Sequence, residues 1–231
     1  MRSALVVLVV IIAATLPPPA GAQSPPIPTL APMVIGVVSG GQVIAGGVPL
    51  SSGSWGTDYI TVSHALSVGA TYAILRSGAP FGESTPVVAC SSAAHGIDVL
   101  ILRVKSHAKL PVVLWGDSDQ LKAGDELTLT PRREFHPEAV KVRFVHGNLL
   151  AWAGSRVQSW PRQWHNVMVG EGYSSPGFTG SPWTIDGKVF GLHKGWVQPA
   201  DRGPRYAVAE AATRVRQCLG QVQYDALIPP D

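Results

Sequence analysis

Charged residues are scarce in this chain of 231 amino acids. Asp, Glu, Lys and Arg make up 14% of the sequence, against about 25% in typical soluble domains. The 18 basic and 15 acidic residues give a net charge of +3, and no run of Lys or Arg is longer than a pair. Nucleic-acid binding depends on clustered positive charge. A nucleic-acid partner is therefore not expected.

Cysteine is nearly absent, since only Cys90 and Cys218 occur. Two cysteines are too few for a disulfide-rich scaffold, and the seven histidines are scattered without the spacing of zinc ligands. We therefore expect no metal site and no cofactor. In an exported protein the pair could form one disulfide, or the two could remain separate buried thiols. The sequence leaves both possibilities open.

The sequence also lacks an apolar run long enough to span a bilayer. Residues 4–16 form an apolar run of 13 residues, against the roughly 20 that a membrane helix needs. Arg2 precedes this run and small residues follow it at 20–22, as in a secretory signal peptide. We expect residues 1–22 to be removed, which leaves 209 of 231 residues, a secreted or periplasmic protein and no stable membrane span. An uncleaved membrane anchor is the alternative.

The remaining chain is rich in short β-branched runs. Residues 23–32 form a Pro/Ser-rich leader, and runs such as "MVIGVVSG", "DVLILRVK" and "KVFGLHKG" then follow one another, separated by Gly, Pro, Ser and Asp. Short strands at this spacing predict an all-β barrel or sandwich. One helix is predicted near the end, in residues 209–223, where apolar residues recur with a 3.6-residue period.

Three short segments contain residues that could form a catalytic site. His64 ends the apolar run "YITVSHAL", Asp98 begins "DVLILRV", and Thr179 lies in the turn "PGFTGSPW". A lone histidine at a strand end is usually structural, and an acidic residue at a strand start is often a turn residue. Their order along the chain is more informative than any one of them.

Together the three segments resemble the trypsin-like (chymotrypsin-fold) serine proteases, in which His, Asp and the nucleophile follow in this order. The segments "LWGDSDQLKAGDEL", "SSPGFTGSPWTIDGKVFGL" and "GPRYAVAEAATRVRQCL" are similar to the bacterial HtrA-like branch. The resemblance implies an all-β fold over residues 33–231. It consists of a double antiparallel β-barrel, six strands in each, split near residues 114–124, with a C-terminal helix. No segment after that helix resembles the PDZ domain often appended to this branch.

The resemblance also implies roles for individual residues. His64 would be the general base, Asp98 would orient the imidazole, and Thr179 would be the nucleophile. The backbone N–H groups of Gly177 and Thr179 would form the oxyanion hole.

The substrate pocket, by the same resemblance, would be lined by Tyr173, His193, Lys194 and Gly195. Tyr173 would shorten the pocket, and no acidic residue is present there to favour Lys or Arg. A small or medium apolar side chain is the expected preference.

The chief departure from the family pattern is Thr179, because serine is expected at the nucleophile. Threonine keeps the hydroxyl, but its extra methyl restricts χ1 and takes up space in the site. Ser181, two residues later, is an alternative nucleophile.

We therefore expect an exported serine-type endopeptidase that acts on polypeptides and that is weak because Thr179 replaces the nucleophilic serine. A catalytically inactive pseudoprotease that binds a peptide or protein partner is the first alternative. A lectin-like or structural β domain is the second.

Overall fold

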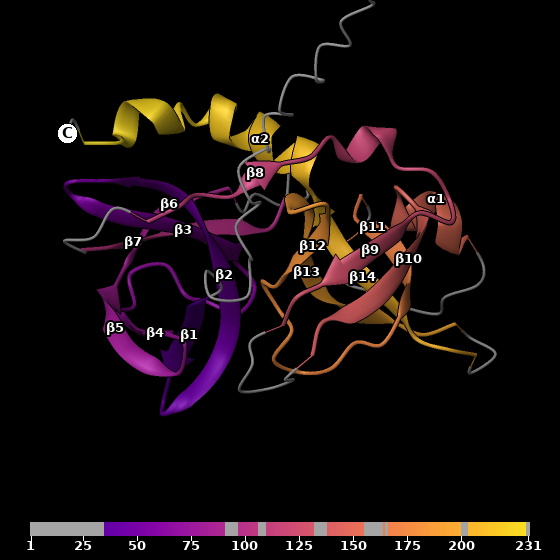
Figure 1. Cartoon of the computed structure of the whole chain (residues 1–231), viewed down its shortest axis with the longest axis horizontal. Helices are drawn as coiled ribbons and strands as arrows, with labels where there is room; N and C mark the ends of the chain where they lie inside the picture. The colour runs from indigo at the N-terminus through magenta and orange to yellow at the C-terminus, as the bar shows by residue number, and fades with distance from the viewer. Residues whose placement is uncertain are drawn as a thin grey trace, which may run out of the picture.

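A computed structural model describes residues 35–90, 97–105, 110–131, 138–154, 164, 166–199 and 203–229. The predicted signal peptide and the Pro/Ser-rich leader lie outside these residues. The described chain forms two sheets side by side, with a helix lying across them (Figure 1). No helix in this part of the chain is long and apolar enough to cross a membrane.

The first sheet contains the N-terminal strands in the order β5-β4-β1-β2-β3-β7-β6. Their bounds are β1 (Ile35–Ser39), β2 (Gln42–Gly53), β3 (Gly56–Val62), β4 (Tyr72–Arg76), β5 (Ala79–Ser84), β6 (Pro86–Ala89) and β7 (Val99–Val104). All described pairings in it are antiparallel. Strand β3 is buried along its whole length, which explains why its apolar run shows no clean alternation.

The second sheet has the order β12-β9-β10-β11-β14-β13-β8. Its strands are β8 (Leu114–Trp115), β9 (Glu126–Leu129), β10 (Val140–His146), β11 (Met168–Gly172), β12 (Pro182–Ile185), β13 (Lys188–Val197) and β14 (Tyr206–Ala211). A further pairing of β12 with β13 closes six of these strands into a barrel. The short β8 adds to β13 in parallel.

The fold class is therefore confirmed as all-β, with two antiparallel barrel-like sheets and a C-terminal helix. The expectation of six strands in each barrel is correct for the second sheet and wrong for the first, which is an open half-barrel of seven strands. Within the described residues, no ladder joins the edge strands β5 and β6. Instead the Ser84 hydroxyl at the end of β5 donates to the Arg103 carbonyl oxygen on β7 at 2.8 Å.

The helices are short and lie outside the sheets. In the described part of the chain they are η2 (Ser118–Gln120), α1 (Leu149–Ala153), α2 (Ala212–Gln221) and η4 (Tyr224–Leu227). The predicted C-terminal helix is confirmed as α2, whose Val215 and Leu219 are buried. These side chains pack in one core cluster with Val48 and Ile60 of the first sheet and Leu192 of the second. The core thus joins α2 to both sheets.

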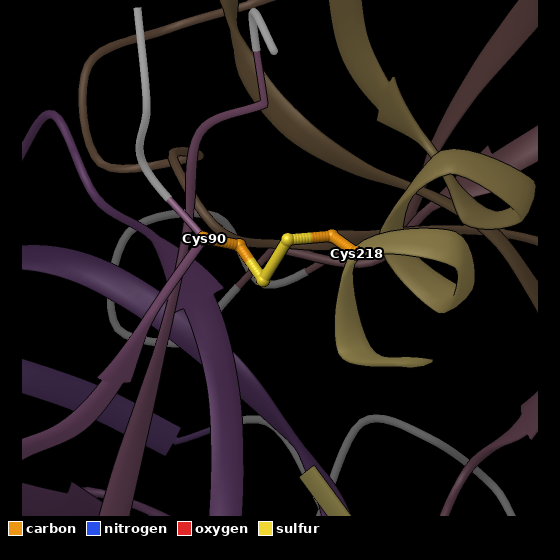
Figure 2. The surroundings of a disulfide bond; sticks show 2 residues. All are labelled: Cys90 and Cys218. Carbon is orange, nitrogen blue, oxygen red and sulfur yellow. A yellow bond between two sulfur atoms is a disulfide. The ribbon is translucent and has the colours of Figure 1, made fainter. Parts of the chain in front are cut away.

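A disulfide joins Cys90, just after β6, to Cys218 in α2, with the Cα atoms 6.1 Å apart (Figure 2). Of the two possibilities that the sequence left open, the structure has the bridge. The Cys90 backbone N–H also donates to the Val99 carbonyl oxygen at 3.0 Å. The bridge therefore ties the C-terminal helix to the beginning of β7.

A buried charged contact ties the C-terminal segment to the first sheet a second time. The Arg103 guanidinium donates to both Asp58 carboxylate oxygens at 2.8 Å, and the Tyr224 hydroxyl donates to Asp58 Oδ2 at 2.7 Å. Arg103 also donates to the Leu227 carbonyl oxygen at 3.0 Å. Each of the three polar side chains therefore has a hydrogen-bond partner within the protein.

Candidate active site

The pairing of β3 with β7 brings His64 and Asp98 together. Val62 and Val99 form the last residue pair of this antiparallel ladder, so the residue before Val99 and the two after Val62 emerge at the same end of the sheet. His64 Nδ1 lies 2.6 Å from Asp98 Oδ2. Two residues that are 34 positions apart thus meet because their strands are neighbours.

Asp98 is held by more donors than a surface carboxylate would have. Its Oδ1 accepts the backbone N–H of Ser63 at 3.0 Å, the Ser63 hydroxyl, and the backbone N–H of His64 at 2.8 Å. Its Oδ2 accepts from the His64 ring and lies 3.3 Å from Lys194 Nζ. Only 3% of Asp98 is exposed.

These contacts decide the charge of Asp98. Burial by itself raises the pKa of this carboxyl, but the hydrogen bond from His64, the charge of Lys194 and the Ser63 hydroxyl outweigh burial and hold its pKa well below the usual range. Asp98 is therefore ionised at neutral pH, and His64 Nδ1 is the donor of their hydrogen bond. The lone pair of the neutral ring is then on Nε2, where a general base needs it.

Thr179 lies in a turn between β11 and β12. The Phe178 N–H donates to the Ser175 carbonyl oxygen at 3.2 Å, and Gly177 has φ +93°. Proline followed by a glycine with positive φ at the two central positions is typical of a type II turn. The turn is half-buried at Thr179.

This turn is pressed against the first sheet. The Gly46 N–H donates to the Thr179 carbonyl oxygen at 2.6 Å, and the Thr61 hydroxyl donates to the Gly46 carbonyl oxygen at 2.5 Å. A Cβ at Gly180 would lie 2.1 Å from that same carbonyl oxygen, and Gly180 has φ +81°. Only glycine fits there. Thr179 therefore lies where β2 and β3 meet the second sheet, and β3 is the strand that leads to His64.

Three polar groups of the turn have no hydrogen-bond partner among the described residues. Among the described residues, neither the Gly177 nor the Thr179 N–H has an acceptor, and the Thr179 hydroxyl has no hydrogen bond, to His64 or to any other group. The structure thus joins His64 to Asp98 by a hydrogen bond and does not join Thr179 to His64 in that way. The roles of Thr179 and of the two amides stay predictions.

Ser181 is poorly placed as an alternative nucleophile. Its exposure is 0%, and its N–H and carbonyl groups are bonded to Phe178 and His193 in the barrel wall. Its hydroxyl lies beside Gly46, where an added Cβ would be 3.6 Å away. A substrate carbonyl cannot reach an enclosed hydroxyl.

The residues expected to line a substrate pocket differ in exposure. Tyr173 is 59% exposed and its ring packs edge-on against Phe178, with centroids 5.8 Å apart. His193 and Lys194 are each 1% exposed. Gly195 has φ +158°, and a Cβ there would lie 2.8 Å from the Trp164 ring. The pocket role of these four residues remains a prediction, and the buried side chains of His193 and Lys194 leave Tyr173 and Gly195 as its more accessible members.

His193 belongs to a buried chain of hydrogen bonds. The Trp183 indole N–H donates to His193 Nδ1 at 3.2 Å, and His193 Nε2 lies 2.9 Å from the Ser174 hydroxyl. Because Nδ1 accepts, Nε2 must carry the proton and donate to Ser174. Burial, together with the neighbouring His64, lowers the pKa of His193 to about 3, so this ring stays neutral.

Three contacts of the site were not anticipated from the sequence. The Ser63 hydroxyl bonds to Asp98, the Trp164 ring lies edge-on to His64 with centroids 6.1 Å apart, and Lys194 reaches Asp98. One signal was available for Lys194, because a charged residue within the apolar strand "VFGLHKGWV" needs a buried partner. In the described part of the chain, no cluster of His, Cys, Asp and Glu could hold a metal ion.

No family model matches the sequence. No curated protein matches it either. Solved structures match it along most of its length. A mutant, inactive form of Rv3671c from M. tuberculosis H37Rv is 19% identical, with a TM-score of 0.63, and the match covers 96% of this chain and 100% of that one.

Two further solved structures also match most of this chain at low sequence identity. The inactive form of the Rv3671c protease has a TM-score of 0.59 at 19% identity, with 91% of this chain and 98% of that chain covered. The protease domain of MamO from Magnetospirillum magneticum, in its apo form, has a TM-score of 0.62 at 16% identity, with 82% and 96% covered. The chain therefore has the double-barrel fold of chymotrypsin-like protease domains, as the sequence resemblance implied.

Proposed function

We propose that this protein is an exported trypsin-like endopeptidase that hydrolyses peptide bonds through His64, Asp98 and Thr179. The observation that carries the proposal is the 2.6 Å contact of His64 Nδ1 with an ionised, buried Asp98. A fold alone does not specify an activity, but this pair fixes the tautomer that a general base needs. The proposal is also supported by the fold that the chain shares with two solved protease structures.

In the proposed reaction, Thr179 Oγ1 attacks the carbonyl carbon of the scissile peptide while His64 Nε2 takes the hydroxyl proton. The oxygen of the tetrahedral intermediate binds to the N–H groups of Gly177 and Thr179. His64 then gives its proton to the leaving amine as the C–N bond breaks. A water molecule then attacks the acyl-enzyme while His64 Nε2 takes its proton. The ester bond to Thr179 breaks, the proton returns to Thr179 Oγ1, and the acid product leaves. The first sheet thus provides the base, and the second sheet, after a boundary proposed near residues 114–124, provides the nucleophile.

Threonine should make this enzyme slow. The Cβ methyl limits the rotamers from which the hydroxyl can face both His64 and a substrate carbon. The backbone amides of the oxyanion hole are unaffected by the methyl. Binding and oxyanion stabilisation alone still give about 10³- to 10⁴-fold acceleration over water in such enzymes. We expect activity above that level and below that of a serine enzyme.

A second candidate function is an inactive protease fold that binds a peptide or protein partner. The observation in its favour is that the Thr179 hydroxyl makes no hydrogen bond to His64 among the described residues. The backbone amides of Gly177 and Thr179, which have no acceptor among the described residues, could bind a peptide carbonyl without any reaction.

Labelling with a fluorophosphonate separates the two candidates. The endopeptidase proposal predicts covalent labelling at Thr179, located by mass spectrometry of the digest, and loss of labelling in His64→Ala. His146→Ala, which changes an exposed histidine, is the matched control and should label like the wild type. If neither the wild type nor Thr179→Ser is labelled although both are folded, the binding function is the better account.

Export is tested on the same material. The intact mass of the protein recovered outside the cytoplasm should correspond to a chain that begins at Gln23. A mass that includes Arg2 would show that the segment is retained as an anchor.

A further inference from the structure

Lys194 is a cation enclosed by protein. It is 1% exposed and is among the largest fully buried side chains. An ammonium group is costly to bury unless it is paired. Its Nζ lies between two carboxylates, 3.3 Å from Asp98 Oδ2 and 3.1 Å from Glu210 Oε2. Both carboxylates are themselves buried.

A β-bulge turns this lysine toward the first sheet. In the ladder of β13 with β14, His193 faces Ala209 and Gly195 faces Val208, so Lys194 is the extra residue. A bulge re-aims the side chain it contains. His193 bonds to Ser174 and Trp183 of the second sheet, whereas Lys194 crosses to Asp98.

Besides Asp98, the Lys194 ammonium is surrounded by Glu210 and the Trp164 ring. Glu210 lies on β14, and its Oε1 is 3.4 Å from Arg214 Nη1 at the beginning of α2. Burial raises the pKa of Glu210, and the charges of Lys194 and Arg214 partly offset this. The Trp164 ring lies 6.0 Å from Lys194 Nζ. The ammonium is thus enclosed by Asp98, Glu210 and Trp164.

We propose that Lys194 is a positioning residue, anchored by Glu210, that holds the Asp98 carboxylate and thereby sets the proton affinity of His64. Its catalytic consequence rests on the function proposed above, while its electrostatic consequence does not. Lys194 and the His64 ring bind the same oxygen, Asp98 Oδ2. The lysine charge therefore offsets part of the attraction between Asp98 and a protonated His64.

The sign of the effect follows from these charges. Without Lys194, an unshielded Asp98 favours the imidazolium form, so His64 keeps its proton to higher pH. His193 adds no opposing change, since it is neutral throughout this range. A base must be unprotonated to act, so the acid limb of kcat/KM should move to higher pH as well.

The test is an NMR titration of the His64 ring in the full exported protein, assigned by the signal lost in His64→Ala. In Lys194→Met we expect the titration midpoint to rise by about one pH unit or more. Lys188→Met removes an exposed lysine from the same strand and should leave the midpoint within about 0.2 units of the wild type, because exposed charges are screened.

A second variant guards against misfolding, because Lys194→Met leaves buried carboxylates without their cation. Lys194→Met/Glu210→Gln removes the outer carboxylate too and should still raise the midpoint, by a smaller amount. A midpoint unchanged in the folded double variant, or lowered in either variant, would overturn the proposal. If the midpoint rises but no variant is ever labelled by a fluorophosphonate, the positioning role stands and the peptidase function fails.

Discussion

The two ends of the candidate site differ in how far the protein itself completes their hydrogen bonds. At the aspartate end, two carboxylate oxygens are contacted by five donor groups from Ser63, His64 and Lys194. At the nucleophile end, the Thr179 hydroxyl and the amides of Gly177 and Thr179 have no partner in the described part of the chain. The turn that carries them is nevertheless fixed by the contacts of Thr179 and Gly180 with Gly46.

This difference indicates which part of the site is ready before a substrate arrives. His64 and Asp98 are already held together by their hydrogen bond, so in the proposed reaction they would need no rearrangement. The N–H groups of Gly177 and Thr179 have no acceptor among the described residues, and in the proposed function they bind a substrate oxygen. If the proposed function is correct, the rate should be limited at Thr179 and not at the His64–Asp98 pair.

The largest effect is expected from damage to the aspartate end. Asp98→Asn should lower the second-order rate constant of fluorophosphonate labelling by about 10³- to 10⁴-fold, because an amide does not hold His64 in the tautomer with a basic Nε2. Asp186→Asn, at an exposed turn position with φ 47° that asparagine tolerates, is the control. Labelling of Asp98→Asn within tenfold of the wild type would show that the pair is structural.

The next largest effect concerns the bridge that supports the aspartate end. Cys90 bonds to Val99, the residue after Asp98, and its disulfide closes a sequence separation of 128. Without the bridge the unfolded chain has a higher conformational entropy. The double variant Cys90→Ser/Cys218→Ser should therefore have a free energy of unfolding about 4 kcal/mol lower than the wild type.

Urea unfolding measures this change, and reduced wild type is the matched comparison, since it should unfold like the double variant. The intact mass of denatured wild type should rise by about 2 Da on reduction, one hydrogen for each sulfur. A double variant within about 1 kcal/mol of the wild type would show that the bridge contributes little.

Low pH should remove the contribution of Asp98 to the stability of the folded protein. The pKa of Asp98 is lower in the folded protein than in the unfolded chain, so its contribution to stability is complete above about pH 5 and is lost as the pH falls below about 4. The stability difference between wild type and Asp98→Asn should therefore narrow by about 2 kcal/mol between pH 6 and pH 2.5. Urea unfolding at a series of pH values measures it, and a difference independent of pH would contradict an ionised Asp98.

The smallest effect is expected at the nucleophile end. Thr179→Ser removes only a methyl and should raise kcat/KM about tenfold or more, which corresponds to about 1.4 kcal/mol of barrier. Thr179→Ala should fall to the level given by binding and the oxyanion hole, and Ser181→Ala should change little. A folded but inactive Thr179→Ser would favour the pseudoprotease. Activity lost in Ser181→Ala and kept in Thr179→Ala would show that the turn has been misassigned.

The sequence by itself determined the all-β class, the C-terminal helix and the likeness to a protease fold. Short β-branched runs cannot bury their faces except in sheets, and the 3.6-residue period around Val215 and Leu219 is a local property of the chain. His64 and Asp98 could also be anticipated, because each lies within two residues of a strand end and their order along the chain matches that of the family they resemble.

The tertiary structure alone decided which partners these residues have. Lys194 looked like a pocket residue, and only the bulge between His193 and Gly195 turns it across the interface to Asp98. The pairing of Cys90 with Cys218 likewise depends on where α2 packs. The openness of the first sheet depends on the edges left by β5 and β6. Such contacts join residues far apart in sequence, and their energies depend on distance and burial, which no local pattern of residues encodes.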